Sequence, residues 1–235
     1  MNDAERIQFV TDKFAEAGIT ITSGMAEKLV GLCDFMVEYN KHVNLTSITE
    51  FEEVVVKHFV DSVLPFFMVD IPQGSSFIDV GTGAGFPALP LLIVRPDLKG
   101  TLCDSLNKRC VYLELACREI KVNAEIIHAR SEELGRKKRE CFDFATARAV
   151  AAMSVLSEYC VPFVRVGGSF IALKSVNEDI ESAAGAVGKL GGKIEMIKDY
   201  TIPNGDSRRL IVVKKISQTP TKYPRSSANI SKKPL

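Results

Sequence analysis

The sequence predicts an α/β fold with a doubly wound, seven-stranded sheet that is mostly parallel and has an antiparallel last strand. Two observations lead to this expectation. From Phe77 onward, short apolar segments alternate with helical stretches, which is typical of βαβ units. The last two apolar segments are separated only by TIPNGDSRR, a connection short enough for an antiparallel hairpin.

Residues 1–70 are expected to form a helical subdomain ahead of the sheet. Apolar residues recur at spacings of three and four in Glu5–Ala17 and Met25–Tyr39, which predicts two amphipathic helices. A third helix is expected to carry Lys57, His58 and Asp61. The expected boundary residues are Gly18, which would end the first helix, and Ser23 and Thr49, which would cap the next two.

The sheet is expected in residues 71–216. Its predicted strands are Phe77–Gly81, Thr101–Asp104, Glu125–Ala129, Phe142–Ala147, Ser169–Lys174, Ile194–Tyr200 and Leu210–Lys215. Its predicted helices are Leu89–Val94, Lys108–Ile120, Val150–Val164 and Asn177–Leu190. Residues 217–235 are rich in Pro, Ser and Lys, so we expect them to form an extended tail.

Charge and cysteine content narrow the class of protein. The formal net charge is +1, so the overall charge names no partner. Six basic and no acidic residues lie between Lys214 and Leu235, which fits either a solvated terminus or an arm that seeks phosphate. The six cysteines form no C-x-x-C pair, so we expect reduced thiols, no metal site and a cytoplasmic protein.

Other features of the chain argue against membrane insertion. The first ten residues, MNDAERIQFV, are too charged for a signal peptide. The longest apolar runs are about ten residues and are interrupted by proline, which is too short for a membrane span. We therefore expect no membrane partner, and a monomer is favoured.

The stretch FIDVGTGAGFP predicts a ligand site. Gly81, Gly83 and Gly85 directly follow the first predicted strand, and ligands of open α/β sheets bind beyond the carboxyl ends of the strands. Asp79 precedes the glycines, and Asp104 ends the second predicted strand. A carboxylate at that second position can accept from both hydroxyls of a ribose. A tight turn and a helix N-cap are the structural alternatives for the glycines and for Asp104.

The residue after the third glycine distinguishes two adenosine-containing cofactors. A dinucleotide site requires a small residue there so that the helix can hold a pyrophosphate. This chain has Phe86 followed by Pro87, which counts against NAD. The spacing D-x-G-x-G-x-G instead resembles the first motif of class I methyltransferases that use S-adenosylmethionine. The sulfonium of that cofactor suits a nearby carboxylate such as Asp79 and an aromatic face such as Phe86.

From Tyr39 to the C-terminus the chain resembles one family closely. The motifs that carry the likeness are YNKHVNLTSI, VKHFVDSV, DVGTGAGFPALPL, LCDSLNKR, the R-S-E of ARSEEL, TARAVA, FIALK and TPTKYPR. The sequence is similar to the bacterial 16S rRNA 7-methylguanosine methyltransferases, also known as glucose-inhibited division protein B. It departs from the family pattern at Ala88, Ala228 and Ile230, where glycine, glycine and proline are usual.

The resemblance implies a fold, a reaction and a cofactor site. The fold would be the Rossmann-like class I methyltransferase sheet with a helical N-terminal subdomain. The reaction would be transfer of a methyl group from S-adenosylmethionine to N7 of a guanosine, at position 527 of 16S rRNA by family resemblance, on naked RNA or the small subunit. The residues that would hold the cofactor are Asp79, Gly81, Gly83, Phe86, Asp104, Ser105, Leu106, Ser131, Glu132 and Arg148.

The same resemblance and the residue chemistry suggest contacts to the RNA. The candidates are Asn44, His58, Asp61, Arg148 and Lys174, together with the basic patch Arg136–Arg139. Asp61 could accept hydrogen bonds from the N1–H and amino edge of guanine. His58 and Asp61 lie at i and i+3 on one predicted helix, so a structural pair that packs the subdomain onto the sheet is the stronger interpretation from the residues alone. Solvation of the surface is the alternative for the basic patch.

The predicted chemistry needs no catalytic triad. N7 of guanine has an in-plane lone pair and carries no proton, so the enzyme supplies position, water exclusion and a suitable charge environment. No catalytic base is therefore assigned. Three other functions remain open at this point: an NAD-dependent oxidoreductase, a methyltransferase for small molecules, and a module that binds the cofactor without transfer.

Overall fold

A computed structural model describes residues 1–148 and 151–235 of the chain. It contains one seven-stranded sheet with the order β3-β2-β1-β4-β5-β7-β6. All neighbouring strands pair in parallel except that β7 is antiparallel to both β5 and β6. The strands are β1 Ser76–Val80, β2 Lys99–Asp104, β3 Ala124–His128, β4 Phe142–Arg148, β5 Val164–Lys174, β6 Gly192–Thr201 and β7 Ser207–Lys215. The predicted fold class and the antiparallel last strand are confirmed.

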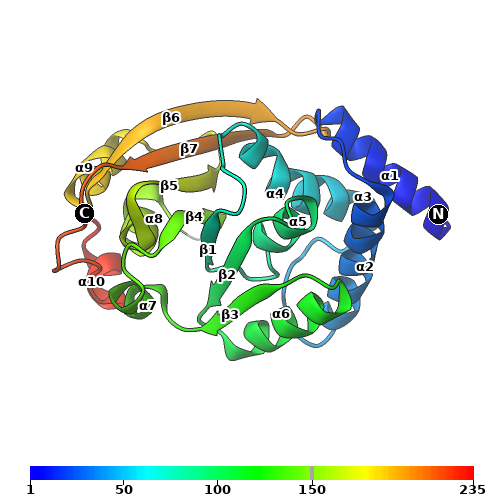
Figure 1. The fold of residues 1–235 in the computed structure, drawn as a ribbon, viewed down its shortest axis with the longest axis horizontal. Coiled ribbons are helices and arrows are strands. Elements are labelled where there is room, and N and C mark those ends of the chain that lie inside the picture. Colours follow the sequence, from blue (N-terminus) through cyan, green and yellow to red (C-terminus); the bar gives the residue numbers. More distant parts are fainter. Residues whose placement is uncertain (149–150) are drawn as a thin grey trace.

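Two apolar cores lie on opposite faces of the sheet, and Figure 1 shows the helices that pack on either side of it. Successive strand residues point to opposite faces, so Phe77 belongs to one core and the adjacent Ile78 to the other. The N-terminal helices, α5 (Ala88–Val94) and α6 (Asn107–Glu119) share the first core. Helices α8 (Met153–Cys160) and α9 (Glu181–Lys189) share the second core. Both faces of the sheet are therefore covered by helices. The carboxyl ends of the parallel strands are the place where a sheet of this kind binds ligands.

The structure of residues 3–67 consists of helices joined by two loops, residues 17–22 and 41–50. They are α1 Asp3–Glu16, α2 Ser23–Asn40, α3 Phe51–Val54, the π-helix η1 Val55–Val60, α4 Asp61–Val63 and the 3₁₀ helix η2 Leu64–Phe67. Gly18, with φ of 75°, follows α1 as expected. The predicted caps Ser23 and Thr49 are wrong. Thr22 caps α2 by accepting from the N–H of Met25, and Glu50 precedes α3 without a side-chain cap. A single residue of offset is within the usual uncertainty of a sequence-based helix end.

The predicted third helix is interrupted by the π-helical turns of η1. At its end, the N–H of Asp61 donates to the carbonyl of Val56, five residues back. The carbonyl of Lys57, four residues back, accepts instead from Nη1 of Arg148 at 3.2 Å. A π-helical turn replaces the hydrogen bond between residues four apart by one between residues five apart, and such turns are frequent at functional sites.

Three helices of the sheet region differ from the prediction. The predicted helix Val150–Val164 begins at a residue outside the described part of the chain. The described helix there is α8, and it is followed by a 3₁₀ turn, η3 (Val161–Phe163), before β5 begins. The predicted helix Asn177–Leu190 is observed only as α9, from Glu181. A short helix, α7 (Ser131–Lys137), was not predicted.

The C-terminal tail is folded onto the body of the protein, so the expected extended conformation is wrong. It ends in the short helix α10 (Ser227–Lys232), with Ile230 fully buried. Arg139 donates to the carbonyls of Tyr223 and Thr219, at 2.5 Å and 2.6 Å. Arg139, which belongs to the basic patch predicted to contact phosphate, therefore holds the tail instead.

Other structural findings concern the part of the chain that the structure describes. None of its helices is both long and apolar enough to cross a membrane. No cluster of three or more His, Cys, Asp or Glu residues in it could hold a metal ion. All six cysteines are free, and Cys141 is the exposed one.

Candidate functional site

The glycine turn after β1 is shaped by backbone geometry. Gly81, Gly83 and Gly85 have φ of 70°, 60° and 87°, a region that residues with a side chain rarely adopt. A Cβ at Gly85 would overlap the side chain of Leu89 on α5. The third glycine is thus required for packing the helix, whereas a Cβ on Gly83 would meet no atom closer than 3.9 Å. The backbone at Gly83 is therefore open to a ligand.

Asp104 ties the glycine turn to the loop after β2. Its Oδ2 accepts from the N–H of Gly83 at 3.0 Å, and its Oδ1 accepts from the N–H of Leu106 at 2.9 Å. The side chain is buried, and Nη1 of Arg109 lies 3.5 Å from Oδ2. A carboxylate has about four acceptor positions, and the groups of Gly83, Leu106 and Arg109 engage three of them, so Asp104 keeps about one position for a ribose hydroxyl.

A small pocket of about 160 Å³, here called pocket A, lies beside this carboxylate. Five of the predicted cofactor residues line it: Gly81, Asp104, Ser105, Ser131 and Glu132. Two further residues, Tyr159 and Ser227, line it without having been predicted. Glu132 is buried at the start of α7, and Leu106 exposes 43% of its surface next to Ser105. The structure therefore brings together the residues predicted for the adenosine half of the cofactor.

Asp79 lies beneath the turn and does not line pocket A. It is fully buried, and its Oδ2 accepts from Thr82 Oγ1 at 2.6 Å and from the N–H of Ala88 at 3.2 Å. Its Oδ1 has no hydrogen-bond partner. Burial raises the pKa of Asp79 to about 7. This carboxylate holds the turn against α5, and any charge it carries is poorly compensated by the protein itself.

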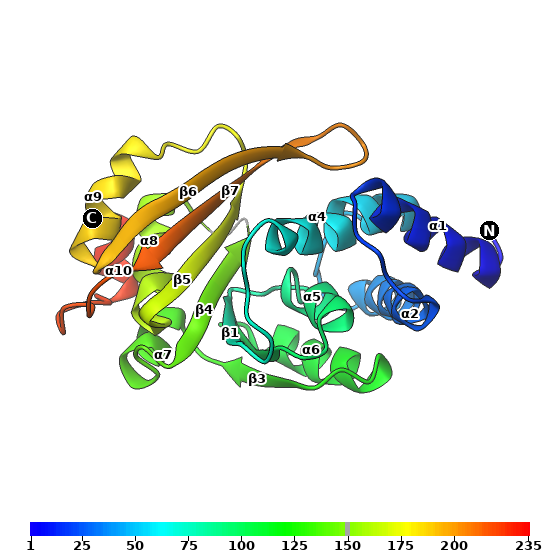
Figure 2. The same cartoon turned by 45° about the horizontal axis from the view of Figure 1, so that its top comes forward.

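A second pocket of about 400 Å³, here called pocket B, lies between the N-terminal helices and the ends of the sheet. Among its charged and polar lining residues are Lys57, His58, Asp61, Arg148, Lys174, Tyr200 and Arg208. They come from η1, α4, β4, β5, β6 and β7. Figure 2 shows why β6 and β7 contribute: their hairpin extends beyond the rest of the sheet and over the helices.

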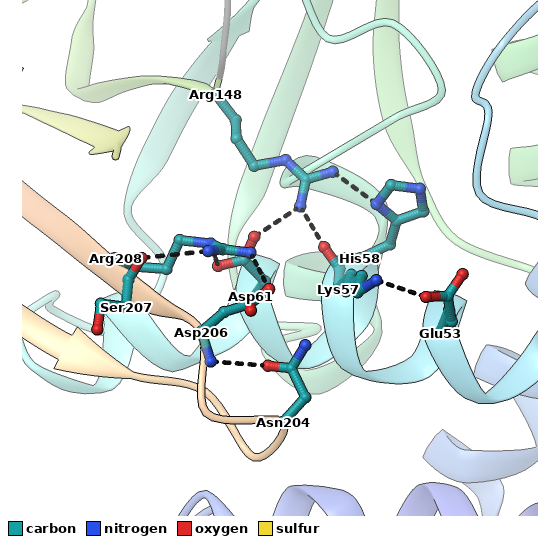
Figure 3. A network of polar contacts seen from close by, with 9 residues as sticks. All are labelled: Glu53, Lys57, His58, Asp61, Arg148, Asn204, Asp206, Ser207 and Arg208. Carbon is teal, nitrogen blue, oxygen red and sulfur yellow. Dashed lines mark hydrogen bonds and ion pairs between the residues drawn. The ribbon is translucent and has the colours of Figure 1, made fainter. Parts of the chain in front are cut away.

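Arg148 is at the centre of the polar network in pocket B (Figure 3). Its Nη1 donates to the carbonyl of Lys57 and lies 3.5 Å from Oδ2 of Asp61. Its Nη2 lies 3.2 Å from Nδ1 of His58. The guanidinium also lies 5.2 Å from the centroid of the Phe86 ring. The last residue of β4 is thereby fixed to the N-terminal helices and to the glycine turn.

Asp61 is shared by two arginines. Its Oδ1 lies 3.2 Å from Nε of Arg208, and its Oδ2 faces Arg148. Burial raises the pKa of Asp61, and the positive charges of Arg148 and Arg208 oppose that shift. Arg208 also pairs with the more exposed Asp206 at 3.2 Å. The two arginines offset part of the free-energy cost of burying this carboxylate.

His58 is held in one tautomer. Since an arginine can only donate, Nδ1 of His58 accepts from Arg148 and Nε2 carries the proton that it donates to Oγ1 of Thr46, at 2.9 Å. Burial, with a smaller effect of Arg148, lowers the pKa of His58 to about 3. His58 and Asp61 contact Arg148 rather than each other. His58 is thus a neutral group with both ring nitrogens engaged.

Phe86 links the glycine turn to two residues of pocket B. Its ring stacks on that of His58 with the centroids 4.6 Å apart, and the guanidinium of Arg148 lies over its face. Because Phe86 follows Gly85 in the glycine turn, the turn beside pocket A contacts residues that line pocket B. The bulky residue that counted against NAD is a contact between the turn and the N-terminal helices.

The structure uses the two remaining RNA candidates differently. Lys174 lines pocket B, but its ammonium pairs with Glu178 at 2.8 Å and donates to the carbonyl of Ala151. Asn44 is exposed and does not line pocket B. In its loop the structural role falls to Asn40, whose side chain accepts from the N–H of Leu45 and of Thr46.

The sequence of this chain is similar to those of known proteins. The sequence profile of the GidB family, described as rRNA small subunit methyltransferase G, matches residues 25–207. Ribosomal RNA small subunit methyltransferase G of Alkaliphilus metalliredigens is 44% identical over 98% of this chain and 99% of its own length. The protein of the same name from Bacillus subtilis is 43% identical over 97% of this chain and 98% of its own length. The chain belongs to this family.

Solved structures support the fold of this GidB family member. A SAM-dependent O-methyltransferase from Thermotoga maritima superposes with a TM-score of 0.52 at 14% identity, covering 79% of this chain and 73% of the other. Precorrin-6y C5,15-methyltransferase from Geobacter metallireducens gives 0.51 at 9% identity, covering 74% and 91%. At such identities the likeness concerns the fold alone, which is that of methyltransferases.

Several lining residues were not singled out by the sequence analysis. Among them, Tyr159 and Ser227 line pocket A, and Tyr200 and Arg208 line pocket B. None of these four belongs to a glycine turn or directly follows one of the central parallel strands. Tyr159 reaches the site through the packing of α8 on the sheet, Ser227 through the docking of the tail, and Tyr200 and Arg208 through the β6–β7 hairpin. The local sequence carries no signal for these long-range contacts.

Proposed function

We propose that this protein transfers a methyl group from S-adenosylmethionine to N7 of a guanosine in 16S rRNA, with pocket A holding the adenosine and pocket B receiving the base. The observation that carries the proposal is the contact of Phe86 with His58 and Arg148. It joins a cofactor turn to a polar pocket in a chain of the GidB family. Sites of two ligands that react with each other must adjoin in this way.

The residues of pocket A fit an adenosine cofactor. Asp104 retains about one acceptor position for a ribose hydroxyl, and Glu132 and Ser131 offer an acceptor and a hydroxyl to the purine edge. Gly81 and Gly83 leave the backbone free of side chains next to the carboxylate of Asp104. When bound, S-adenosylmethionine supplies an electrophilic methyl group on a positively charged sulfur. Asp79 is buried below the turn with one free oxygen, and its ionised form would be favoured by the positive charge of the cofactor.

Pocket B fits a base that needs no deprotonation. His58 is neutral with both nitrogens engaged, so it is not placed to take a proton. Asp61 is the acceptor that can meet the N1–H and amino edge of guanine, a contact that strengthens as the base gains positive charge on methylation. Arg148 orients Asp61 and His58, and with Phe86 it closes the wall between the pockets. Lys57 and Arg208 place positive charge where the RNA backbone would enter.

The test offers the purified protein labelled S-adenosylmethionine and small ribosomal subunits that lack the modification, followed by digestion of the RNA to nucleosides. Label in 7-methylguanosine is the expected result. Label in another nucleoside would reject the N7 assignment. Cofactor binding without any labelled nucleoside would favour a small-molecule substrate or a binding module. Naked 16S rRNA tested in parallel would identify the substrate form.

A further inference from the structure

The C-terminal segment, residues 217–235, reaches pocket A. Ser227, the first residue of α10, lines the pocket together with Tyr159 of α8. The two hydroxyl oxygens lie 3.4 Å apart. The rest of the lining comes from the ends of β1 and β2 and from the loop that leads into α7. Part of the wall of pocket A is thus supplied by residues almost at the end of the chain.

A buried ion pair fixes this segment against α8. Glu158 is fully buried, and Arg225 reaches it with Nη2 at 2.6 Å, Nε at 2.9 Å and its backbone N–H at 2.8 Å. Nη1 of Arg225 also donates to the carbonyl of Lys233 at 2.9 Å, on the far side of α10. A carboxylate with no exposure requires such a partner. The tail therefore satisfies a charge that α8 could not bury alone.

Further contacts hold the segment on both sides of this ion pair. Ile230 of α10 is fully buried, and Tyr223 is 7% exposed. Arg136 Nε donates to the carbonyl of Pro224 at 3.2 Å from α7, the helix whose start carries Ser131 and Glu132. The same two helices, α7 and α8, thus carry pocket A residues and anchor the tail.

We propose that the C-terminal segment is a built part of the cofactor site, in which α10 walls the adenine end of pocket A and Ser227 determines the affinity for an adenosine ligand. This inference rests on the proposed function, because it takes pocket A as the adenosine site. The ligand class is a purine nucleoside with a free amino edge, to which Ser227 and Tyr159 can offer hydroxyl groups. The tail then acts on cofactor binding, although its basic residues suggest RNA.

Two single substitutions on α10 test the wall. Ser227→Phe places a ring into a pocket of about 160 Å³, and it should weaken binding of S-adenosylhomocysteine and of adenosine by the same factor, about tenfold or more. Ala228→Phe is the matched control, because Ala228 is the next residue on the same helix, is exposed and does not line pocket A. Its affinities should stay within about twofold of the wild type. Both are measured by titration calorimetry on the full chain.

Two milder substitutions keep the proposal testable even where Ser227→Phe fails to fold. Ser227→Ala removes only the hydroxyl and should weaken S-adenosylhomocysteine binding about threefold. Arg225→Lys keeps the charge but loses the fork, so it should weaken binding more than Ala228→Phe does. In steady-state assays both should raise KM for S-adenosylmethionine and leave KM for the small subunit unchanged, a split that a merely structural loss would not produce.

The outcomes separate this inference from the proposed function. If the wild type binds S-adenosylhomocysteine and folded Ser227→Phe binds it equally well, the wall is rejected while the proposed function stands. If Ser227→Phe weakens binding of the small subunit and spares the cofactor, the tail is an RNA contact and the inference is likewise overturned. A wild type that binds neither S-adenosylhomocysteine nor S-adenosylmethionine would reject both.

Discussion

Pockets A and B lie at the same edge of one sheet but are built in different ways. In pocket A, backbone N–H groups of Gly83 and Leu106 converge on a single carboxylate, and most of the wall comes from turns that directly follow strands. In pocket B, side chains from six separate elements meet, and the ion pairs at its centre join Asp61 of α4 to Arg148 of β4 and Arg208 of β7. The comparison teaches that a cofactor turn is encoded locally, whereas the substrate pocket depends on long-range packing.

The largest effect is expected from a substitution that disrupts pocket B and leaves pocket A intact. Asp61→Asn removes the charge shared by Arg148 and Arg208, so it should reduce methyl transfer roughly 100-fold, because truncating one partner of a buried charge pair is costly. The affinity for S-adenosylhomocysteine should remain within about twofold of the wild type. Single-turnover transfer and calorimetry measure the two effects. An equal loss of cofactor affinity would mean that the pockets are not separable.

The second prediction breaks pocket A. In Asp104→Asn one carboxylate oxygen becomes an amide nitrogen, which cannot accept from the N–H of Gly83 or Leu106. Losing such a charge-assisted hydrogen bond should weaken binding of S-adenosylhomocysteine by roughly 10- to 100-fold. Calorimetry measures the affinity, and filter binding of small subunits should show no change. Unchanged cofactor affinity would show that Asp104 serves only as a turn residue.

The third prediction sharpens the comparison through pH. The folded pKa of Asp79 is raised to about 7 from 3.8, so the protonated carboxyl favours the folded state. The stabilising effect is fully present near pH 4 and is lost as the pH rises to 7. In Asp79→Asn this part of the dependence should disappear. Urea unfolding at pH 4.5, 5.5, 6.5 and 7.5 would measure it, and an identical pH slope in both proteins would contradict the raised pKa.

The smallest effect is expected at the rim of pocket B. Asp206→Asn removes a carboxylate that also pairs with Arg208, but the Asp206 side chain is 43% exposed against 9% for Asp61, and an ion pair open to solvent contributes less. Methyl transfer should fall by less than about threefold. The substitution is therefore the matched control for Asp61→Asn, since both variants lose one negative partner of the same arginine. If Asp206→Asn reduced methyl transfer as much as Asp61→Asn does, the pair of Asp206 and Arg208 in the hairpin would matter as much as the contacts of Arg148, and the prediction would be wrong.

The sequence determined the parts of this protein whose physics is local. Alternating apolar segments specify strands that are covered on both faces, and three glycines followed by a phenylalanine specify a tight turn. Gly81 and Asp104 were predicted because they lie at the ends of the first two strands, where a parallel sheet binds its ligands, whereas Ser131 and Glu132 were expected only from the family resemblance. The seven strands were predicted from the alternation of apolar and helical segments, and the antiparallel last strand from the short connection before it.

Only the tertiary structure decided how distant segments meet. No spacing in the sequence relates Arg208 to Asp61, since their pairing requires the β6–β7 hairpin to lie over the π-helical turn. Composition predicted an extended tail, but buried Glu158 provides the charge that folds Arg225 and α10 onto the body. The energy of a buried ion pair depends on what surrounds both partners, and those surroundings exist only once the chain has folded.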